Sequence, residues 1–310
     1  MIPGDNNKER RAPELLLEDE ALRDGLQMES EIFSLEEKLQ LFRLLEGSGI
    51  RRIQVGSFVH PRIVPQMADT DELIRNIGET KGTVLTALVL NEKGLERALA
   101  CGLKHLSMSV SASDTHSRKN AGMSAVEALD SMTRLIALAA GDGVQVRAGF
   151  QCSFGCVYEG AVKPDTVIRG ITRMTQAGAS EVNLADTTGM ASPYSVSSLA
   201  ERAAMELPGV RVSLHLHDTT GLGLANMFAG YEAGVRIFDV AAGGLGGCPF
   251  VKGAAGNVPA EDAVNMFESM GVDTGVDLDA LCGAVGFLES RLGRALPGRM
   301  SRILKGAMCG

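Results

Sequence analysis

The run Glu14-Leu-Leu-Leu-Glu-Asp-Glu-Ala-Leu22 is followed by Arg23-Asp-Gly-Leu-Gln27, and a different pattern then extends from Ser34 to Gly47. The first run is a strand candidate. Ser34-Leu-Glu-Glu37 has the spacing of a capping box, in which a serine and a glutamate close the first turn of a helix. This switch from strand to helix indicates an α/β protein. The helical pattern places three apolar residues on one face: Leu35, Leu39 and Phe42.

The same alternation recurs along the chain without a compositional break. Eight strands that alternate with helices predict a single-domain (β/α)8 TIM barrel. An open doubly wound sheet is the alternative, but its phosphate fingerprint G-x-G-x-x-G is missing after the first strand. We expect the barrel over residues 14–292, between a flexible N-terminal segment (1–13) and a C-terminal tail (293–310). The further strand candidates are Arg52–Phe58, Val84–Leu90, His105–Ser111, Val144–Cys152, Glu181–Asp186, Val210–His217 and Val235–Ala242.

Composition narrows the class of protein. The chain has 310 residues, a formal charge of -8 and 45% hydrophobic residues, of which few are aromatic, so it can form a large aliphatic core. No Lys/Arg block is present, which argues against a nucleic-acid partner. No segment resembles a signal peptide or a membrane span, and we expect a cytoplasmic protein without a membrane partner. We expect reduced thiols at all six cysteines: Cys101, Cys152, Cys156, Cys248, Cys282 and Cys309. We assign no function to Cys309.

Two histidines end the seventh strand candidate, in Ser213-Leu-His-Leu-His-Asp218. Residues at i and i+2 of a strand point to the same face, and chemistry in a barrel sits at the C-terminal ends of its strands. His215 and His217 therefore suit a metal, although a hydrogen-bonded structural pair is the alternative. No cysteine pattern suggests a Cys/His zinc site, and a mixed site with a carboxylate and an amide oxygen favours Mg²⁺ or Mn²⁺.

The carboxylate candidate is Asp24, at the end of the first strand. Adjacent residues of a strand project to opposite sides, so Arg23 and Asp24 reach the same barrel mouth only if Gly25 bends the chain. A surface salt bridge is the alternative interpretation of this pair.

A glycine-rich stretch from Gly243 to Asn257 carries Cys248 and follows the last strand candidate. Glycine at this density suits a tight bend or a close approach to a ligand, so we predict an active-site flap. An ordinary surface loop is the alternative.

Several motifs of the chain closely resemble those of 3-hydroxy-3-methylglutaryl-CoA lyases, in the same order, from about Leu17 to Leu281. The resemblance implies a TIM barrel that binds one divalent cation through Asp24, His215, His217 and Asn257, with no organic cofactor, and it favours a homodimer. The motifs are Arg23–Gln27, Ser57–Asp69, Cys152–Gly160, Leu184–Gly189, His215–Gly221 and Gly244–Pro249.

The implied reaction is retro-Claisen cleavage of a 3-hydroxyacyl-CoA that carries a second carboxylate, to acetyl-CoA and a 3-keto acid such as acetoacetate. A base must take the hydroxyl proton; Asp186 is the first candidate and His215 the second. Asp186 also suits a turn residue before Thr187-Thr-Gly189. Arg23 would stabilise charge that develops on the thioester oxygen, and Cys248 would donate a proton to the carbanion carbon.

The chain departs from the family pattern at Gln54, where the lyases have a glutamate. Gln54 cannot transfer protons, and we assign it with Gln27 to substrate binding. Asp19-Glu-Ala-Leu22 before Arg23 is closer to the condensing members of the superfamily. An acyl-CoA-dependent condensing enzyme of the isopropylmalate or homocitrate synthase type therefore remains an alternative, as does a barrel without catalytic activity; Cys248 and its flap favour the lyase.

Overall fold

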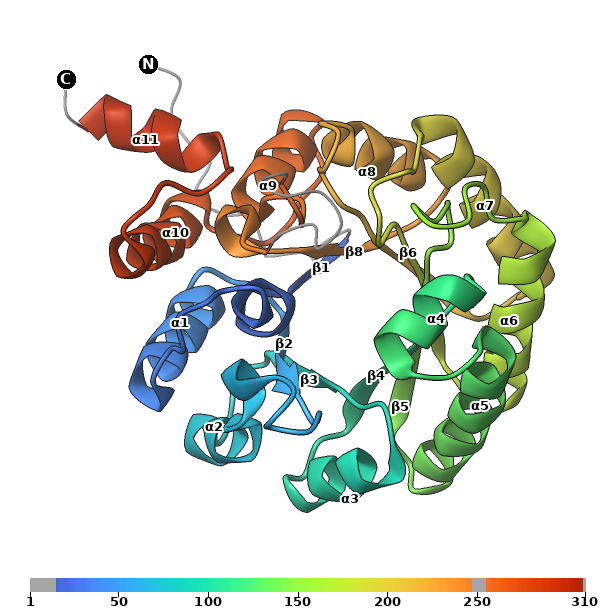
Figure 1. Cartoon of the computed structure of the whole chain (residues 1–310). Helices are drawn as coiled ribbons and strands as arrows, with labels where there is room; N and C mark the ends of the chain where they lie inside the picture. Colours follow the sequence, from blue (N-terminus) through green and yellow to red (C-terminus); the bar gives the residue numbers. More distant parts are fainter. Residues whose placement is uncertain (1–14, 247–254, 309–310) are drawn as a thin grey trace.

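Eight parallel strands form a closed barrel in which each strand pairs with the next and β8 pairs with β1 (Figure 1). The computed structural model describes residues 15–246 and 255–308. The closure confirms the predicted (β/α)8 barrel and rules out the open doubly wound sheet, because an open sheet leaves its edge strands unpaired. The strands are β1 (Leu16–Asp19), β2 (Arg52–Ser57), β3 (Val84–Leu88), β4 (His105–Ser111), β5 (Gln145–Gln151), β6 (Glu181–Ala185), β7 (Arg211–His215) and β8 (Ile237–Val240).

Helices surround the barrel as an outer ring (Figure 1). The first helix begins as predicted, because the Ser34 hydroxyl accepts a hydrogen bond from the Glu37 amide and the Glu37 carboxylate accepts one from the Ser34 amide. The helices are α1 (Leu35–Gly47), α2 (Thr70–Ile77), α3 (Glu92–Ala100), α4 (Asp114–Ala121), α5 (Ala125–Gly141), α6 (Pro164–Gln176), α7 (Pro193–Glu206), α8 (Gly223–Glu232), α9 (Ala260–Ser269), α10 (Leu278–Leu292) and α11 (Met300–Met308).

All strands except β4 end one to three residues earlier than the sequence predicted, and two of these earlier ends bear on the site. The first ends at Asp19 instead of Leu22, because Ala21–Gly25 form a π-helical turn in which the Gly25 amide donates to the Glu20 carbonyl at 3.1 Å. The seventh ends at His215, and His217 beyond it forms an isolated antiparallel bridge with Asn257. In both places the chain leaves the barrel sheet at its C-terminal rim and makes other backbone contacts, in the π-helical turn after β1 and in the His217–Asn257 bridge after β7. These two places carry the predicted metal ligands.

The strands alternate between an aliphatic outer face and a charged inner face. Phe238 of β8 packs against Phe267 of α9, with 5.5 Å between ring centroids, and Leu214 of β7 meets the Gly230 position of α8. The core therefore lies between strands and helices. The barrel interior instead holds buried charged residues: Glu18, Glu20, Arg52, Arg147, Glu181 and Asp239.

The segment after α10 packs against the barrel. Leu296 is buried, the Gly298 amide donates to the Gly243 carbonyl at 3.1 Å, and the Asp262 carboxylate accepts from the Met300 amide at 2.8 Å. Figure 1 shows α11 beside α10. These contacts bring residues 296–300 against the start of the glycine-rich stretch.

Two expectations from composition meet the structure here. Of the helices in residues 15–246 and 255–308, none is both long and apolar enough to cross a membrane. Four cysteines are free thiols, as expected: Cys101, Cys152, Cys156 and Cys282. Cys248 and Cys309 lie outside the described residues.

Candidate metal centre and active site

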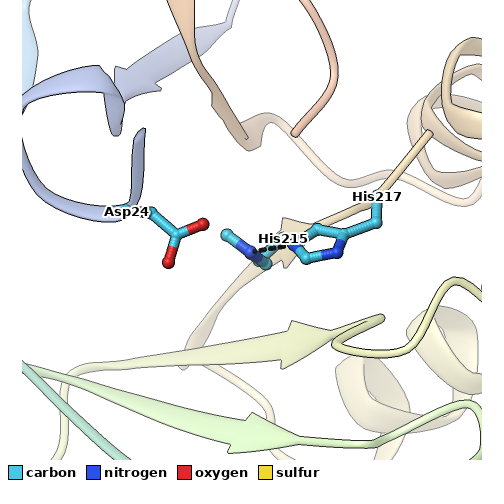
Figure 2. A group of neighbouring side chains, drawn as sticks. All are labelled: Asp24, His215 and His217. Carbon is cyan, nitrogen blue, oxygen red and sulfur yellow. Dashed lines mark hydrogen bonds between the residues drawn. The ribbon is translucent and has the colours of Figure 1, made fainter. Parts of the chain in front are cut away.

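Three side chains turn their ligand atoms toward one another at the C-terminal mouth of the barrel. Asp24, His215 and His217 each offer one ligand atom, and these atoms all lie within 4.8 Å of one another. Figure 2 shows the Asp24 carboxylate facing the two imidazoles from the opposite side of the site. The Nε2 atoms of the two histidines are 3.1 Å apart. The prediction that Gly25 bends the chain is met by the π-helical turn, which carries Asp24 away from β1.

The rings are held in the form that a metal requires. His215 Nδ1 lies 3.1 Å from Asp239 Oδ2, so the proton resides on Nδ1 and the Nε2 lone pair faces the site. Burial and the neighbouring His215 lower the pKa of His217 to about 3, which keeps this ring neutral. Burial opposes a charge on His215, but Asp239 and Asp24 raise its pKa overall. The same negative surroundings attract a cation, because a proton and a metal ion compete for one lone pair.

Asn257 completes the predicted ligand set. It is buried, and its amide nitrogen donates to Asp24 Oδ2 at 2.9 Å and to the Leu245 carbonyl at 3.0 Å. The amide oxygen is then the atom that would ligate. A Cβ on Gly246 would lie 2.7 Å from the Asn257 amide nitrogen, and a Cβ on Gly25 would lie 2.9 Å from Leu245. The absence of a Cβ at both glycines therefore permits these close approaches, whereas the sequence predicted a bend at Gly25 and a tight bend or a close approach to a ligand for the stretch that contains Gly246.

The donor set fits a divalent cation. Burial raises the pKa of Asp24, but Arg23, with His215 and the hydrogen bond from Asn257, outweighs it and holds this pKa well below its usual range, so the carboxylate is ionised. One carboxylate, two imidazoles and an amide oxygen are ligands that Mg²⁺ and Mn²⁺ accept. The hydrogen-bonded histidine pair of the alternative interpretation is also present, but a carboxylate within ligand distance of both rings favours a cation.

Arg23 lies beside this cluster and is fixed by three different acceptors. Its Nη1, Nη2 and Nε atoms donate to Asp24, Glu20 and Gln54 respectively. Gln54 is completely buried, and its amide nitrogen donates to Glu20 Oε1 at 3.0 Å. Gln27 is half-buried in the turn after Arg23 and Asp24. Direct contact of Gln27 or Gln54 with a substrate stays a prediction.

Asp186 combines the two roles that the sequence left open. Its Oδ1 accepts hydrogen bonds from the Met190 amide at 2.8 Å and the Ala191 amide at 3.1 Å, as a turn residue does. Its Oδ2 is buried and has no hydrogen-bond partner among the described residues. Burial raises the pKa of Asp186 to about 6, against the opposing effect of these amides and of His215. A carboxylate with one unengaged oxygen and a pKa near neutrality suits a general base.

The charged interior beneath the site was missed by sequence reasoning. Arg147 donates to Glu18 at 2.7 Å, to Asp239 at 2.5 Å and to Glu20 at 3.0 Å. Glu20, His215 and Asp239 also bring ligand atoms within 4.8 Å of one another, but Arg147 already supplies the positive charge there. The available signal was charge at alternate positions of otherwise apolar strands.

The glycine-rich stretch is anchored where it leaves β8. The Ala242 amide donates to Asp19 and the Gly243 amide to Glu261, both at 2.9 Å, and both carboxyl groups are buried. The stretch returns at Ala255–Asn257. Cys248, the predicted proton donor, lies in the part that the structure does not describe.

Comparison with known proteins identifies the family of the chain. The HMGL-like family model matches residues 14–287 of the chain. The chain belongs to the HMGL-like family. An (R)-citramalyl-CoA lyase of Chloroflexus aurantiacus is 40% identical over 289 residues, which cover 90% of this chain and 91% of that protein. The family assignment and its lyase relatives make this HMGL-like protein a carbon–carbon lyase.

Two solved structures share the fold of this HMGL-like protein throughout. The HMG-CoA lyase of Bacillus subtilis matches with a TM-score of 0.91 at 36% identity, and the match covers 95% of this chain and 99% of that one. An HMG-CoA lyase from Acinetobacter baumannii, in complex with coenzyme A and 3-methylmalate, matches with a TM-score of 0.88 at 36% identity and covers 93% and 94% of the two chains. The barrel and the family named from the motifs are thereby confirmed.

Proposed function

We propose that this HMGL-like protein cleaves 3-hydroxy-3-methylglutaryl-CoA, or a close analogue, to acetyl-CoA and a 3-keto acid with the help of Mg²⁺ or Mn²⁺. The observation that carries the proposal is the convergence of Asp24, His215 and His217, with Asn257 hydrogen-bonded to Asp24, at the C-terminal mouth of a barrel of this family. The coenzyme A bound to a relative of the same fold supports a thioester substrate.

A cation at the proposed site would bind the hydroxyl group of the substrate. A bound divalent cation polarises such a hydroxyl and lowers its pKa. Asp24, His215, His217 and Asn257 would hold the ion, and Asp239 keeps His215 in the ligating tautomer from behind.

Asp186 is the proposed base for the hydroxyl proton. Its unengaged Oδ2 accepts the proton while Oδ1 stays fixed by the Met190 and Ala191 amides. As the hydroxyl carbon becomes a ketone, the bond to the neighbouring carbon breaks and its electron pair passes to the thioester as an enolate. The proton moves to Asp186 and then to solvent.

Arg23 is the proposed partner of the enolate oxygen. Its guanidinium cannot lose its proton at neutral pH, and its three acceptors hold it beside Asp24. Protonation of the enolate carbon completes acetyl-CoA, and Cys248 is the proposed donor.

A second substrate is favoured by the relative from Chloroflexus aurantiacus, which is an (R)-citramalyl-CoA lyase. Citramalyl-CoA is one methylene shorter than 3-hydroxy-3-methylglutaryl-CoA between the hydroxyl carbon and the second carboxylate. The same bond cleavage would yield acetyl-CoA and pyruvate. One methylene changes discrimination by about 10- to 200-fold in an apolar pocket, so the two substrates are separable by kinetics.

The test is a product-resolved assay of both thioesters with Mg²⁺, Mn²⁺ or EDTA. We expect metal-dependent release of acetyl-CoA, with acetoacetate or pyruvate as the second product, and a kcat/KM that identifies the preferred acyl group. Incubation of acetyl-CoA with 2-oxo acids tests the condensing alternative. Turnover that persists in EDTA, or condensation without cleavage, would contradict the proposal.

A further inference from the structure

A buried carboxylate, Glu20, accepts a hydrogen bond from a different guanidinium nitrogen of Arg23 than Asp24 does. Glu20 follows β1 directly and is completely buried. Its Oε2 accepts from Arg23, and its Oε1 accepts from the Gln54 amide nitrogen and from Arg147, at 3.0 Å each. Glu20 thus connects Arg23 to Arg147 of the charged interior, and Gln54 makes a second, longer connection through its amide nitrogen to Glu18 Oε1 at 3.4 Å.

The orientation of the Gln54 amide follows from these partners. Its oxygen accepts from Arg23 Nε, so its nitrogen must face Glu20. A glutamate at position 54, as in the family pattern, would place a second carboxylate oxygen about where that nitrogen lies, against Glu20 Oε1. Two carboxylates in contact cannot both stay ionised. A carboxylate at position 20 therefore requires a neutral donor at position 54.

Each guanidinium nitrogen of Arg23 donates to a different side chain, which fixes both the position and the plane of the group. A guanidinium has five N–H groups. Three are engaged by Gln54, Glu20 and Asp24, which leaves two for an oxyanion in the mouth. Loss of the Glu20 or the Gln54 acceptor would let this plane rotate without removing its charge.

We propose that Glu20 is a positioning residue for Arg23 and that Gln54 is its obligatory amide partner, so that this chain supplies from the end of β1 the carboxylate that the family pattern has on β2. The inference rests on the proposed role of Arg23 at the developing enolate. It explains Gln54 by an exchange of carboxylate and amide between two contacting residues, positions 20 and 54. On this explanation, Gln54 does not determine which substrate the protein prefers.

The exchange is testable with Glu20→Gln, Gln54→Glu and the double variant, which returns the carboxylate to β2. Charge-assisted hydrogen bonds to a fixed group support a loss of about 10- to 100-fold in kcat for each single variant. KM and the Mn²⁺ dissociation constant should stay within about twofold, because the metal ligands are untouched. The double variant should have a higher kcat than either single variant, since carboxylate and amide face each other again at positions 20 and 54. Recovery should be incomplete, because the Gln54 nitrogen of the parent also donates to Glu18 Oε1 at 3.4 Å and a carboxylate there cannot.

The matched control is Glu181→Gln. Glu181 is equally buried and ion-paired, but it contacts Arg52 and not Arg23. We expect a lower melting temperature with unchanged kcat per folded molecule. Should Glu20→Gln not fold, Glu20→Asp keeps the charge but is one methylene too short, and its kcat should fall at near-parental melting temperature. Parental kcat in Glu20→Gln or Glu20→Asp, or a double variant as slow as the singles, overturns the proposal.

Arg23→Gln separates this inference from the proposed function. A large loss of kcat in Arg23→Gln, measured against a parent protein that releases acetyl-CoA, supports the role of Arg23 on which the inference depends. Parental kcat in Arg23→Gln overturns that role and this inference together, while the lyase reaction itself is judged by the product assay.

Discussion

The mouth of the barrel and its interior both contain buried acidic side chains, but these carboxylates have different partners. In the interior, Glu181 accepts two hydrogen bonds from Arg52 at 2.9 Å each, and Glu18 pairs with Arg147. At the mouth, the ligand atoms of Asp24 and the two histidines face one another. Arg52 and Arg147 pair with the carboxylates of the interior, whereas at the mouth Arg23 pairs with Asp24 while two imidazoles also turn their ligand atoms toward that carboxylate. The imidazole lone pairs beside the carboxylate, and not acidity alone, distinguish the proposed cation site from the structural cluster.

The largest loss of stability is expected for Arg147→Met, which disrupts the charged interior of the barrel. This substitution removes a partner shared by three buried carboxylates, and breaking a buried ion pair in this way costs about 3–5 kcal/mol of unfolding free energy. Arg211→Met is the control, because Arg211 is half-exposed and 3.6 Å from Glu181, and it should cost less than about 1 kcal/mol. Urea unfolding measures both; equal losses would show that burial of the pair is irrelevant.

At the mouth, Asp24→Asn should abolish metal binding without unfolding the protein. The amide retains hydrogen-bonding capacity but not the negative charge, and we expect a loss on the order of 10³-fold in kcat/KM. Calorimetric titration with Mn²⁺ measures the affinity. The parent should also gain about 2.7 kcal/mol of stability at a metal concentration 100 times its dissociation constant. An Asp24→Asn variant that still shows this gain would exclude Asp24 as a ligand.

Buried carboxyls without an arginine sharpen the comparison. Burial raises the pKa of Glu261 to about 7, whereas Arg52 overcomes the effect of burial and lowers the pKa of Glu181. The folded state therefore holds a proton on Glu261 that the unfolded chain releases above its ordinary pKa of 4.5. Stability should fall as pH rises from about 4.5 to 7, by about 3 kcal/mol at most from this group.

Glu261→Gln tests this through melting temperatures between pH 4 and pH 8. The glutamine still accepts the Gly243 amide, so the fall in stability with rising pH should become smaller. Glu36→Gln, at an exposed position of α1, should leave the parental profile unchanged. An unaltered profile in the Glu261 variant would show that this carboxyl is ionised in the fold.

The smallest effect is expected where the two regions meet. Asp239 contacts both Arg147 and His215, and Asp239→Asn weakens its hold on the His215 tautomer without removing a ligand. Partners of this kind typically change metal affinity by 10- to 100-fold, so we expect about that loss in Mn²⁺ binding. Ser213→Ala, at a neighbouring inward position of β7, serves as the control. Equal Mn²⁺ affinity in the parent and in Asp239→Asn would show that this carboxylate stabilises the charged interior but does not affect metal binding.

Sequence reasoning found the mouth because its residues lie where strands end. His215 and His217 share a face by local geometry, and the glycine at position 25 indicated that the chain turns near Asp24. The same reasoning extended β1 to Leu22, since nothing local distinguishes a strand from a π-helical turn there. It also left Asp186 divided between a turn and a base, because the two oxygens of one carboxylate can serve both.

The amino-acid sequence by itself determined the alternation of strands and helices, the barrel that follows from it, and the residue types available for metal binding and proton transfer. These are consequences of local periodicity and of where each strand ends. Only the tertiary structure decided which charges are compensated, because Arg52 meets Glu181 and Arg147 meets Glu18 across 129 residues of chain. It also decided that Glu20 faces Gln54, since barrel closure, and not spacing along the chain, brings inward side chains of neighbouring strands into contact.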